Sequence, residues 1–178
     1  SLGKKIGAIL GGTLVTVAAI GAVIVASKLS KINTVKLDTD KLSVSKEAKK
    51  RGSGYLNVAL FGVDSRDNDL DKGTRSDTIM IASLNKKTMK VKIASIYRDT
   101  LSEQEDGTLN KINAAYSYGG PEGALSVLNK NLDMNIEHYV TVNFNSMIDI
   151  VDSVGGIDID VQEDEMPYIC GYVQEISS

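Results

Sequence analysis

The sequence predicts an α/β domain with a mixed central sheet covered by helices, preceded by one transmembrane helix. Three observations carry this prediction: an uncharged apolar run over residues 6–26, strand-like runs between residues 55 and 96, and alternating helix and strand patterns after residue 119. Strands followed by helix–strand–helix–strand are typical of a mixed sheet with helices packed on it. A chain of 178 residues leaves room for about one domain once a membrane segment is set aside.

The apolar run is long enough to cross a membrane. Its 21 residues carry no charge and, rising about 1.5 Å each in a helix, span about 30 Å, the thickness of a bilayer's hydrocarbon core. The alternative is a secretory signal peptide, whose apolar region is only about 7–15 residues and ends at a small-residue cleavage motif. This run is longer and ends at Ser27 and Lys28. We expect a single-pass cell-membrane protein, with residues 1–5 as a cytoplasmic stub and an extracytoplasmic domain.

Two features of this segment leave alternatives open. Lys4 and Lys5 favour a cytoplasmic N-terminus, but three lysines also follow the run closely, at Lys28, Lys31 and Lys36. Gly7 and Gly11 have the spacing of a helix-pairing face, which also arises by chance in Gly- and Ala-rich spans, so the oligomeric state stays open.

Charge divides the chain at about residue 54. Residues 1–54 hold ten Lys and Arg against three acidic residues, whereas residues 55–178 hold ten against twenty. Residues 27–54 therefore read as a polar, basic linker that suits anionic lipid headgroups, with one short helix over residues 44–51. The acidic remainder argues against nucleic acid as a partner, because phosphate backbones need a basic face. Cys170 is the only cysteine, so no internal disulfide is possible.

The domain over residues 55–178 opens with strands. Residues 55–63 form a dense apolar run that fits a buried strand, and two further runs over 78–84 and 91–96 are separated by a turn at Asn85. A helix is expected from Pro121, followed by a strand over 139–142. Beyond these, we expect a helix capped by Asn145 and a strand over residues 157–161, after which no closing element is evident.

Acidic and basic residues gather where the predicted strands meet loops. Asp64 ends the first strand and Asp77 opens the second, so both carboxylates are expected at one edge of the sheet, where Arg98 can join them. Carboxylates with substrate phosphates suit Mg²⁺, and arginine grips phosphate oxygens in pairs. The pattern indicates a pyrophosphate–metal site; the alternative is a set of ordinary surface ion pairs.

Other templates fit less well. Asp67, Asp69 and Asp71 alternate, but a calcium loop counted from Asp67 lacks its glycine at position six and its glutamate at position twelve. His138 is the only histidine, which argues against a Ser-His-Asp triad or a zinc–histidine cluster.

Four segments together resemble the LytR-CpsA-Psr family of bacterial envelope proteins. They read NVALFGVDSR, TRSDTIMIASLNKKTMKVKIASIYRDT, KINAAYSYGG and VNFNSMIDIVDSVGGIDIDV, and they cover about residues 55–161 in unbroken order. The resemblance implies a membrane-anchored phosphotransferase that moves a glycopolymer, such as a wall teichoic acid or a capsular polysaccharide, from a polyprenyl-pyrophosphate carrier onto peptidoglycan. It also implies an α/β fold that holds the polyprenyl tail in an apolar pocket.

The resemblance also implies roles for particular residues. Asp64 and Asp77 match positions that hold Mg²⁺, and Arg75 and Arg98 match positions that bind the pyrophosphate. Lys111 is expected to assist these arginines in binding the pyrophosphate. Two more residues fall in matching motifs with less defined roles: Arg66, expected to bind substrate, and Asp99, expected to orient Arg98 or to transfer a proton.

The chain departs from the family pattern at its end. The family continues into a segment with an Arg-x-Arg pair that completes the phosphate site, and no arginine follows Arg98 here. The domain is therefore expected to be incomplete and the chain inactive by itself. Two alternative functions remain: hydrolysis of the same lipid pyrophosphates, or a non-catalytic envelope regulator or lipid-binding scaffold.

Overall fold

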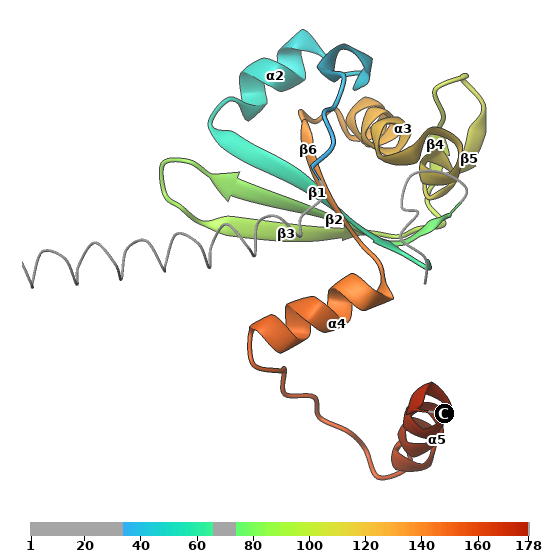
Figure 1. Ribbon diagram of the computed structural model, residues 1–178. Helices are drawn as coiled ribbons and strands as arrows, with labels where there is room; N and C mark the ends of the chain where they lie inside the picture. The colour runs from blue at the N-terminus through green and yellow to red at the C-terminus, as the bar shows by residue number, and fades with distance from the viewer. Residues whose placement is uncertain (1–33, 66–73, 178) are drawn as a thin grey trace, which may run out of the picture. The chain divides into compact units, whose positions relative to one another are not determined.

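The central element of the structure is a four-stranded sheet. The computed structural model describes residues 34–65 and 74–177 (Figure 1), and the sheet has the order β3-β2-β1-β6. β1 (Tyr55–Val63) pairs antiparallel with β2 (Ser76–Asn85) and parallel with β6 (His138–Val142), and β2 pairs antiparallel with β3 (Val91–Ile96). The predicted mixed sheet is confirmed, and its four strands overlap the predicted runs.

The predicted transmembrane helix over residues 6–26 lies outside the described residues, as do Arg66 and the aspartates at 67, 69 and 71. Among the helices in the described ranges, none is long and apolar enough to cross a membrane. Contacts group Asp38–Ser178 into one compact unit, and the features below belong to this unit.

One face of the sheet forms the core. Alternate residues of β1 point to this face because side chains alternate along a strand, and Ala59, Phe61 and Val63 are buried there. They are covered by α3 (Ala114–Leu132), whose Leu125 and Leu128 are also buried (Figure 1). The opposite face is more open: large apolar side chains there include Val91, Ile93 and Val140.

Helix α3 contains a kink where the sequence predicts a helix start. Gly120 has φ 63° and ψ −157°, a conformation open almost only to glycine, and it separates a short first segment from the helix that begins at Pro121. The first segment places Tyr116 in the core, where its ring meets Phe61 edge to face at 5.2 Å between centroids. The predicted start at Pro121 is therefore confirmed for the second segment of α3.

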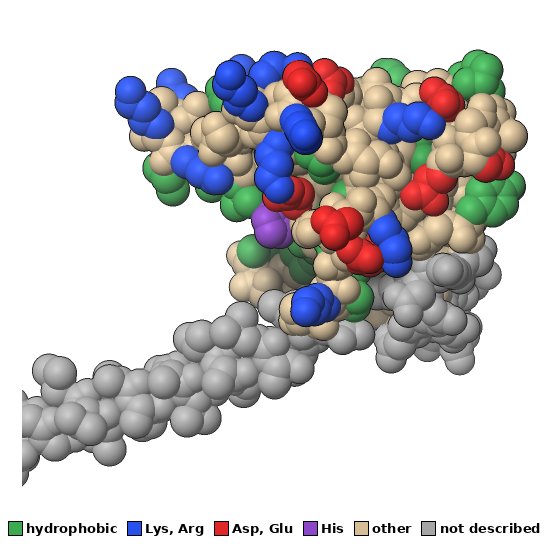
Figure 2. All heavy atoms as spheres, turned by 90° about the horizontal axis from the view of Figure 1, so that it is seen from above, with side chains coloured by type: hydrophobic (Ala, Val, Ile, Leu, Met, Phe, Trp, Pro, Cys, Tyr) green, Lys and Arg blue, Asp and Glu red, His purple; other side chains and the backbone are tan. Residues whose placement is uncertain are grey.

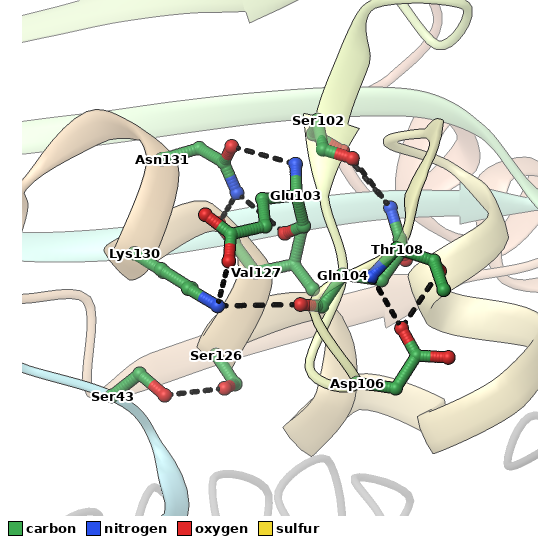
Figure 3. A network of polar contacts seen from close by, with 10 residues as sticks. All are labelled: Ser43, Ser102, Glu103, Gln104, Asp106, Thr108, Ser126, Val127, Lys130 and Asn131. Carbon is green, nitrogen blue, oxygen red and sulfur yellow. Dashed lines mark hydrogen bonds and ion pairs between the residues drawn. The ribbon is translucent and has the colours of Figure 1, made fainter.

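A small hairpin that the sequence patterns do not reveal packs against α3. It consists of β4 (Leu101–Glu103) and β5 (Leu109–Lys111). Figure 3 shows how it is held: the Asn131 side chain accepts from Glu103 N at 2.9 Å and donates to Glu103 O at 2.9 Å, and Lys130 Nζ donates to Glu103 Oε1 at 2.8 Å. Strands of three residues are too short for an alternating pattern to stand out.

Residues 38–54, which the sequence assigns to a linker, pack against α3 and β1 instead. After η1 (Thr39–Lys41), Leu42 is fully buried, and its carbonyl accepts from Asn129 Nδ2 at 2.8 Å. The predicted short helix is present as α2 (Lys46–Gly52), with Ser45 as its N-cap and Ala48 buried. Leu42 and Ala48 are the buried apolar residues of this lysine-rich stretch, and its composition alone does not predict that they are buried.

The C-terminal part differs from the prediction in three places. α4 (Phe144–Ser153) is capped by Asn143, whose side chain accepts from Ser146 N at 2.9 Å, and not by Asn145. Residues 157–161 do not form the predicted strand, because no strand in the described part of the chain pairs with them. A further helix, α5 (Met166–Ser177), occupies the stretch where no element is predicted.

Candidate functional site

A bulge at the start of β2 sets the geometry of the site. Gly62 pairs with Thr78 but Val63 pairs with Ser76, so Asp77 is an extra residue on β2. The two strands approach closely here, because a Cβ on Gly62 would lie 3.0 Å from the Cβ of Thr78, a distance that only a small shift of Thr78 would relieve. Ser76 is buried, with 1% of its surface exposed, whereas Asp77 is exposed. The bulge therefore presents the Asp77 carboxylate to solvent at the end of the sheet.

Arg98 lies opposite Asp77 because of the β2–β3 register. Ile79 pairs with Ile96, and in an antiparallel pair the positions two residues further out, Asp77 and Arg98, also face each other. Arg98 Nη1 lies 2.5 Å from Asp77 Oδ1. Arg98 belongs to a turn in which Thr100 N donates to Tyr97 O at 2.9 Å, and this turn fixes its backbone.

Two further charges extend this pair into a row. Lys111, at the end of β5, lies with its Nζ 2.5 Å from Asp99 Oδ1, and the other Asp99 oxygen lies 3.8 Å from Arg98 Nε. Backbone bonds hold the two segments together, since Asn113 N donates to Arg98 O at 3.2 Å. The hydrogen bond from Lys111 lowers the pKa of the Asp99 carboxyl below its usual range. We call Asp77, Arg98, Asp99 and Lys111 the charged row.

The other predicted residues lie at the same end of the sheet or outside the described ranges. Asp64 follows the last residue of β1, and Arg75 precedes the first residue of β2; both are exposed. Within residues 34–65 and 74–177, neither forms an ion pair. Arg66 lies outside the described residues. The structure thus brings four of the seven predicted residues into contact and places two more beside them.

The donor set fits a magnesium ion that keeps most of its water. Mg²⁺ binds through one or two carboxylates plus water and substrate phosphates, and Asp64 and Asp77 are exposed carboxylates at the ends of two paired strands. A larger protein cage is absent: no group of three or more His, Cys, Asp or Glu that could hold a metal occurs among the described residues. The arrangement therefore suits an ion that arrives with a phosphate substrate.

The charged row is suited to chemistry more than to stability. Its side chains are 45–60% exposed, and exposed ion pairs contribute only about 0–1 kcal/mol each. Alternating charges instead hold Arg98 and Lys111 in place, with remaining N–H donors available for a phosphate oxygen. The bulge and the β4–β5 hairpin that position these groups depend on tertiary contacts, which explains why residue patterns alone do not reveal them.

Comparisons with known proteins agree with this architecture. TagU of Bacillus cereus (strain AH820), named a polyisoprenyl-teichoic acid–peptidoglycan teichoic acid transferase, is 39% identical over 126 residues, which are 70% of this chain and 40% of the relative. The chain therefore spans about 40% of the length of that relative.

Solved structures share the fold. The crystal structure of Bacillus subtilis TagV has a TM-score of 0.53 at 35% identity, with 60% of this chain and 43% of that chain covered. TagT with bound octaprenyl pyrophosphate lipid has a TM-score of 0.55 at 23% identity over 75% of this chain and 47% of that chain, a likeness that concerns the fold alone. The model of the LytR_cpsA_psr family matches residues 20–175, and the chain therefore belongs to the LytR-CpsA-Psr family.

Proposed function

We propose that this chain is part of a membrane-anchored phosphotransferase that moves a glycopolymer from a polyprenyl-pyrophosphate carrier onto peptidoglycan. The observation that carries the proposal is the charged row, which brings residues from two of the four family segments together at one end of the sheet. The names of the relatives support it: TagU is named a teichoic acid transferase to peptidoglycan, and TagT holds octaprenyl pyrophosphate.

Each step of the reaction needs a group that the site offers. An acceptor hydroxyl oxygen forms a bond to the phosphorus that carries the polymer and its proton passes to water, while the bond from this phosphorus to the bridging oxygen breaks and polyprenyl phosphate leaves with the electron pair. Negative charge grows on the phosphate oxygens, where Arg75, Arg98 and Lys111 supply positive charge. These three cations are assigned to binding the pyrophosphate.

Asp99 is assigned to positioning. A carboxylate with a lowered pKa is a weaker base, so Asp99 is poorly suited to accept the proton of the acceptor hydroxyl. It contacts both Arg98 and Lys111, and it can hold the two cations at a fixed spacing. Of the two roles that the resemblance allows, the structure therefore favours orientation of Arg98.

Magnesium and the membrane complete the proposal. Asp64 and Asp77 would hold Mg²⁺, which when bound neutralises charge on the pyrophosphate. Residues 6–26 would anchor the protein in the cell membrane with the site outside the cytoplasm, on the side where peptidoglycan lies. Because the chain spans 40% of the length of TagU, we expect little transferase activity from these 178 residues alone.

The test supplies a synthetic polyprenyl-pyrophosphate sugar, with and without Mg²⁺ and peptidoglycan, to an ectodomain of the full family length. Arg98→Ala is expected to lower kcat about 10²–10³-fold, since it removes a donor to the charge that develops in the transition state. Lys41→Ala serves as the matched control, because it removes an exposed cation paired with Asp38 away from the site. Equal turnover by the Arg98 variant and the control would contradict the proposal.

The products separate the remaining alternatives. Transfer predicts sugar phosphate attached to peptidoglycan, and its dependence on Mg²⁺ is expected to disappear when Asp77 is replaced by Asn. Free sugar phosphate without attachment would indicate hydrolysis instead. Lipid binding without turnover in any variant would indicate a scaffold.

A further inference from the structure

A buried amide lies where the β4–β5 hairpin turns. Gln104 is 5% exposed, and its Nε2 donates to Ser102 Oγ at 3.0 Å, as Figure 3 shows, and to Lys111 O at 3.4 Å. Ser102 is 3% exposed, and its Oγ donates in turn to Asn110 O at 3.3 Å. These hydrogen bonds join the end of β4 to β5, and one of them ends on the backbone of Lys111, a member of the charged row.

The orientation of the Gln104 amide follows from its partners. Its Nε2 also lies 3.4 Å from Ser102 O, and this oxygen and Lys111 O are carbonyl oxygens, which only accept hydrogen bonds. The NH2 end of the amide therefore faces them. A carboxylate or an apolar side chain of the same length would lose these contacts, because neither has a donor to give.

The peptide group that follows Lys111 is held at both of its polar atoms. Its N–H, which belongs to Ile112, donates to Thr100 O at 2.8 Å, and its C=O accepts from Gln104 Nε2. A peptide group is planar, so hydrogen bonds at both atoms restrict rotation of the whole plane. The direction in which the Lys111 side chain leaves the backbone is restricted with it.

The turn that carries Gln104 is itself anchored to α3. Lys130 Nζ donates to Gln104 O at 3.4 Å and to Glu103 Oε1 at 2.8 Å. An isolated two-stranded hairpin is marginally stable, and strands of three residues form few ladder hydrogen bonds. The contacts with α3 therefore give Gln104 a fixed position from which it holds Lys111.

A fixed backbone matters because the partner of an exposed lysine is weakly determined. Figure 2 shows Asp and Glu side chains next to Lys and Arg side chains on one face of the molecule. The Lys111 side chain is 60% exposed, and exposed ion pairs contribute little free energy, so charge alone does not keep its Nζ at Asp99. The place of Lys111 in the charged row therefore depends on the backbone that Gln104 holds.

We propose that Gln104 is a positioning residue of the phosphotransferase site, which holds Lys111 beside Asp99 so that Lys111 and Arg98 bind one pyrophosphate together. Gln104 acts through Lys111, because a side chain that is 5% exposed has almost no surface for a substrate to contact. The inference rests on the proposed function, in which Lys111 binds the pyrophosphate.

The first test needs no turnover. Gln104→Met keeps the length of the side chain and removes its donors, and the Asp99 carboxyl is titrated by NMR in the full chain in micelles of a neutral detergent. The hydrogen bond from Lys111 lowers the pKa of Asp99, so release of Lys111 is expected to raise this pKa toward the ordinary value for an aspartate.

A control separates this effect from a general loss of stability. Asn129→Ala removes buried hydrogen bonds to Leu42 O and Ile136 O, outside the hairpin, and is expected to leave the pKa of Asp99 unchanged. An unchanged pKa of Asp99 in Gln104→Met, or an equal rise in both variants, would overturn the proposal whether or not the protein is a transferase.

The second test is a double-mutant cycle in an ectodomain of the full family length, with the synthetic polyprenyl-pyrophosphate sugar as substrate. Lys111→Gln is expected to lower kcat/KM about 10–100-fold, through loss of a hydrogen bond from a charged group, and Gln104→Met about 3–10-fold. If Gln104 acts through Lys111, the double variant loses no more than Lys111→Gln alone, whereas independent contributions multiply.

The outcomes separate this inference from the proposed function. A multiplied loss in the double variant would overturn the positioning role while the transferase activity stands. Absence of turnover in the parent would contradict the proposed function instead, and the titration of Asp99 would still decide whether Gln104 positions Lys111.

Discussion

At the scale of single residues, the candidate site depends on Asp77, which the bulge exposes, and on the three charged side chains linked to it by ion pairs. Asp77 faces Arg98 because of the strand register, and Asp99 joins Arg98 to Lys111. None of these groups is buried, so their arrangement depends on one another and on the backbone bonds beneath them.

Removal of Lys111 is therefore expected to change the titration of Asp99. The hydrogen bond from Lys111 is the largest cause of the lowered pKa of this carboxyl, so Lys111→Gln should raise the pKa toward the ordinary value for an aspartate. In the parent, the contact is present above that value and is lost only as pH falls through the lower pKa of the folded state. NMR titration of the Asp99 carboxyl carbon measures its pKa in the parent and in the variant. An unchanged pKa in Lys111→Gln would contradict the attribution of the lowered pKa to Lys111.

At the scale of elements, α3 joins the site to the core through its kink. Gly120 separates the first segment, which holds Tyr116 in the core, from the longer segment that begins at Pro121, and Lys111 lies at the surface just before the helix. One continuous stretch of chain thus contributes Tyr116 to the core and Lys111 to the charged row.

Gly120→Ala is expected to lower the free energy of unfolding by about 1–3 kcal/mol, because its backbone lies in a region where a Cβ is strained. Gly54→Ala is the matched control, since a Cβ there meets nothing within 4 Å and no positive φ is required. Denaturant unfolding of the full chain compares the two. Equal stability of both variants would show that the kink carries no strain cost.

At the scale of the whole unit, residues 38–54 act as part of the domain. Asn129 lies at the junction: its side chain donates to Leu42 O at 2.8 Å and to Ile136 O at 2.9 Å, and it accepts from Ile136 N at 2.7 Å. One buried amide thereby connects the N-terminal segment, α3 and the entry to β6. This contact explains why a lysine-rich stretch is not a free linker.

Asn129→Ala is expected to cost about 2–4 kcal/mol of stability, because it leaves buried backbone groups without partners. Residues 38–54 should also become more sensitive to limited proteolysis than in the parent. Asn131→Ala, which removes bonds at an exposed position, is the comparison and should cost about 1 kcal/mol or less. If residues 38–54 resist proteolysis equally in Asn129→Ala and in the parent, Asn129 does not hold them to the domain, and they would again be interpreted as a linker.

The sequence by itself determined the mixed α/β class, the four strands of the main sheet and the residues of the charged row. Strands reveal themselves through dense apolar runs such as Tyr55–Val63, and Asp77, Arg98 and Lys111 fall in motifs that resemble one family. These signals are local, because each depends on neighbours within a few positions along the chain.

Tertiary structure alone decided which groups meet. The bulge at Asp77, the three-residue strands β4 and β5, and the burial of Leu42 depend on partners far away in the sequence. The same reason explains the failed strand over residues 157–161: its alternating pattern is local, but a strand forms only where another strand accepts its hydrogen bonds. Patterns along the chain give each element its tendency, and long-range pairing selects which tendencies are realised.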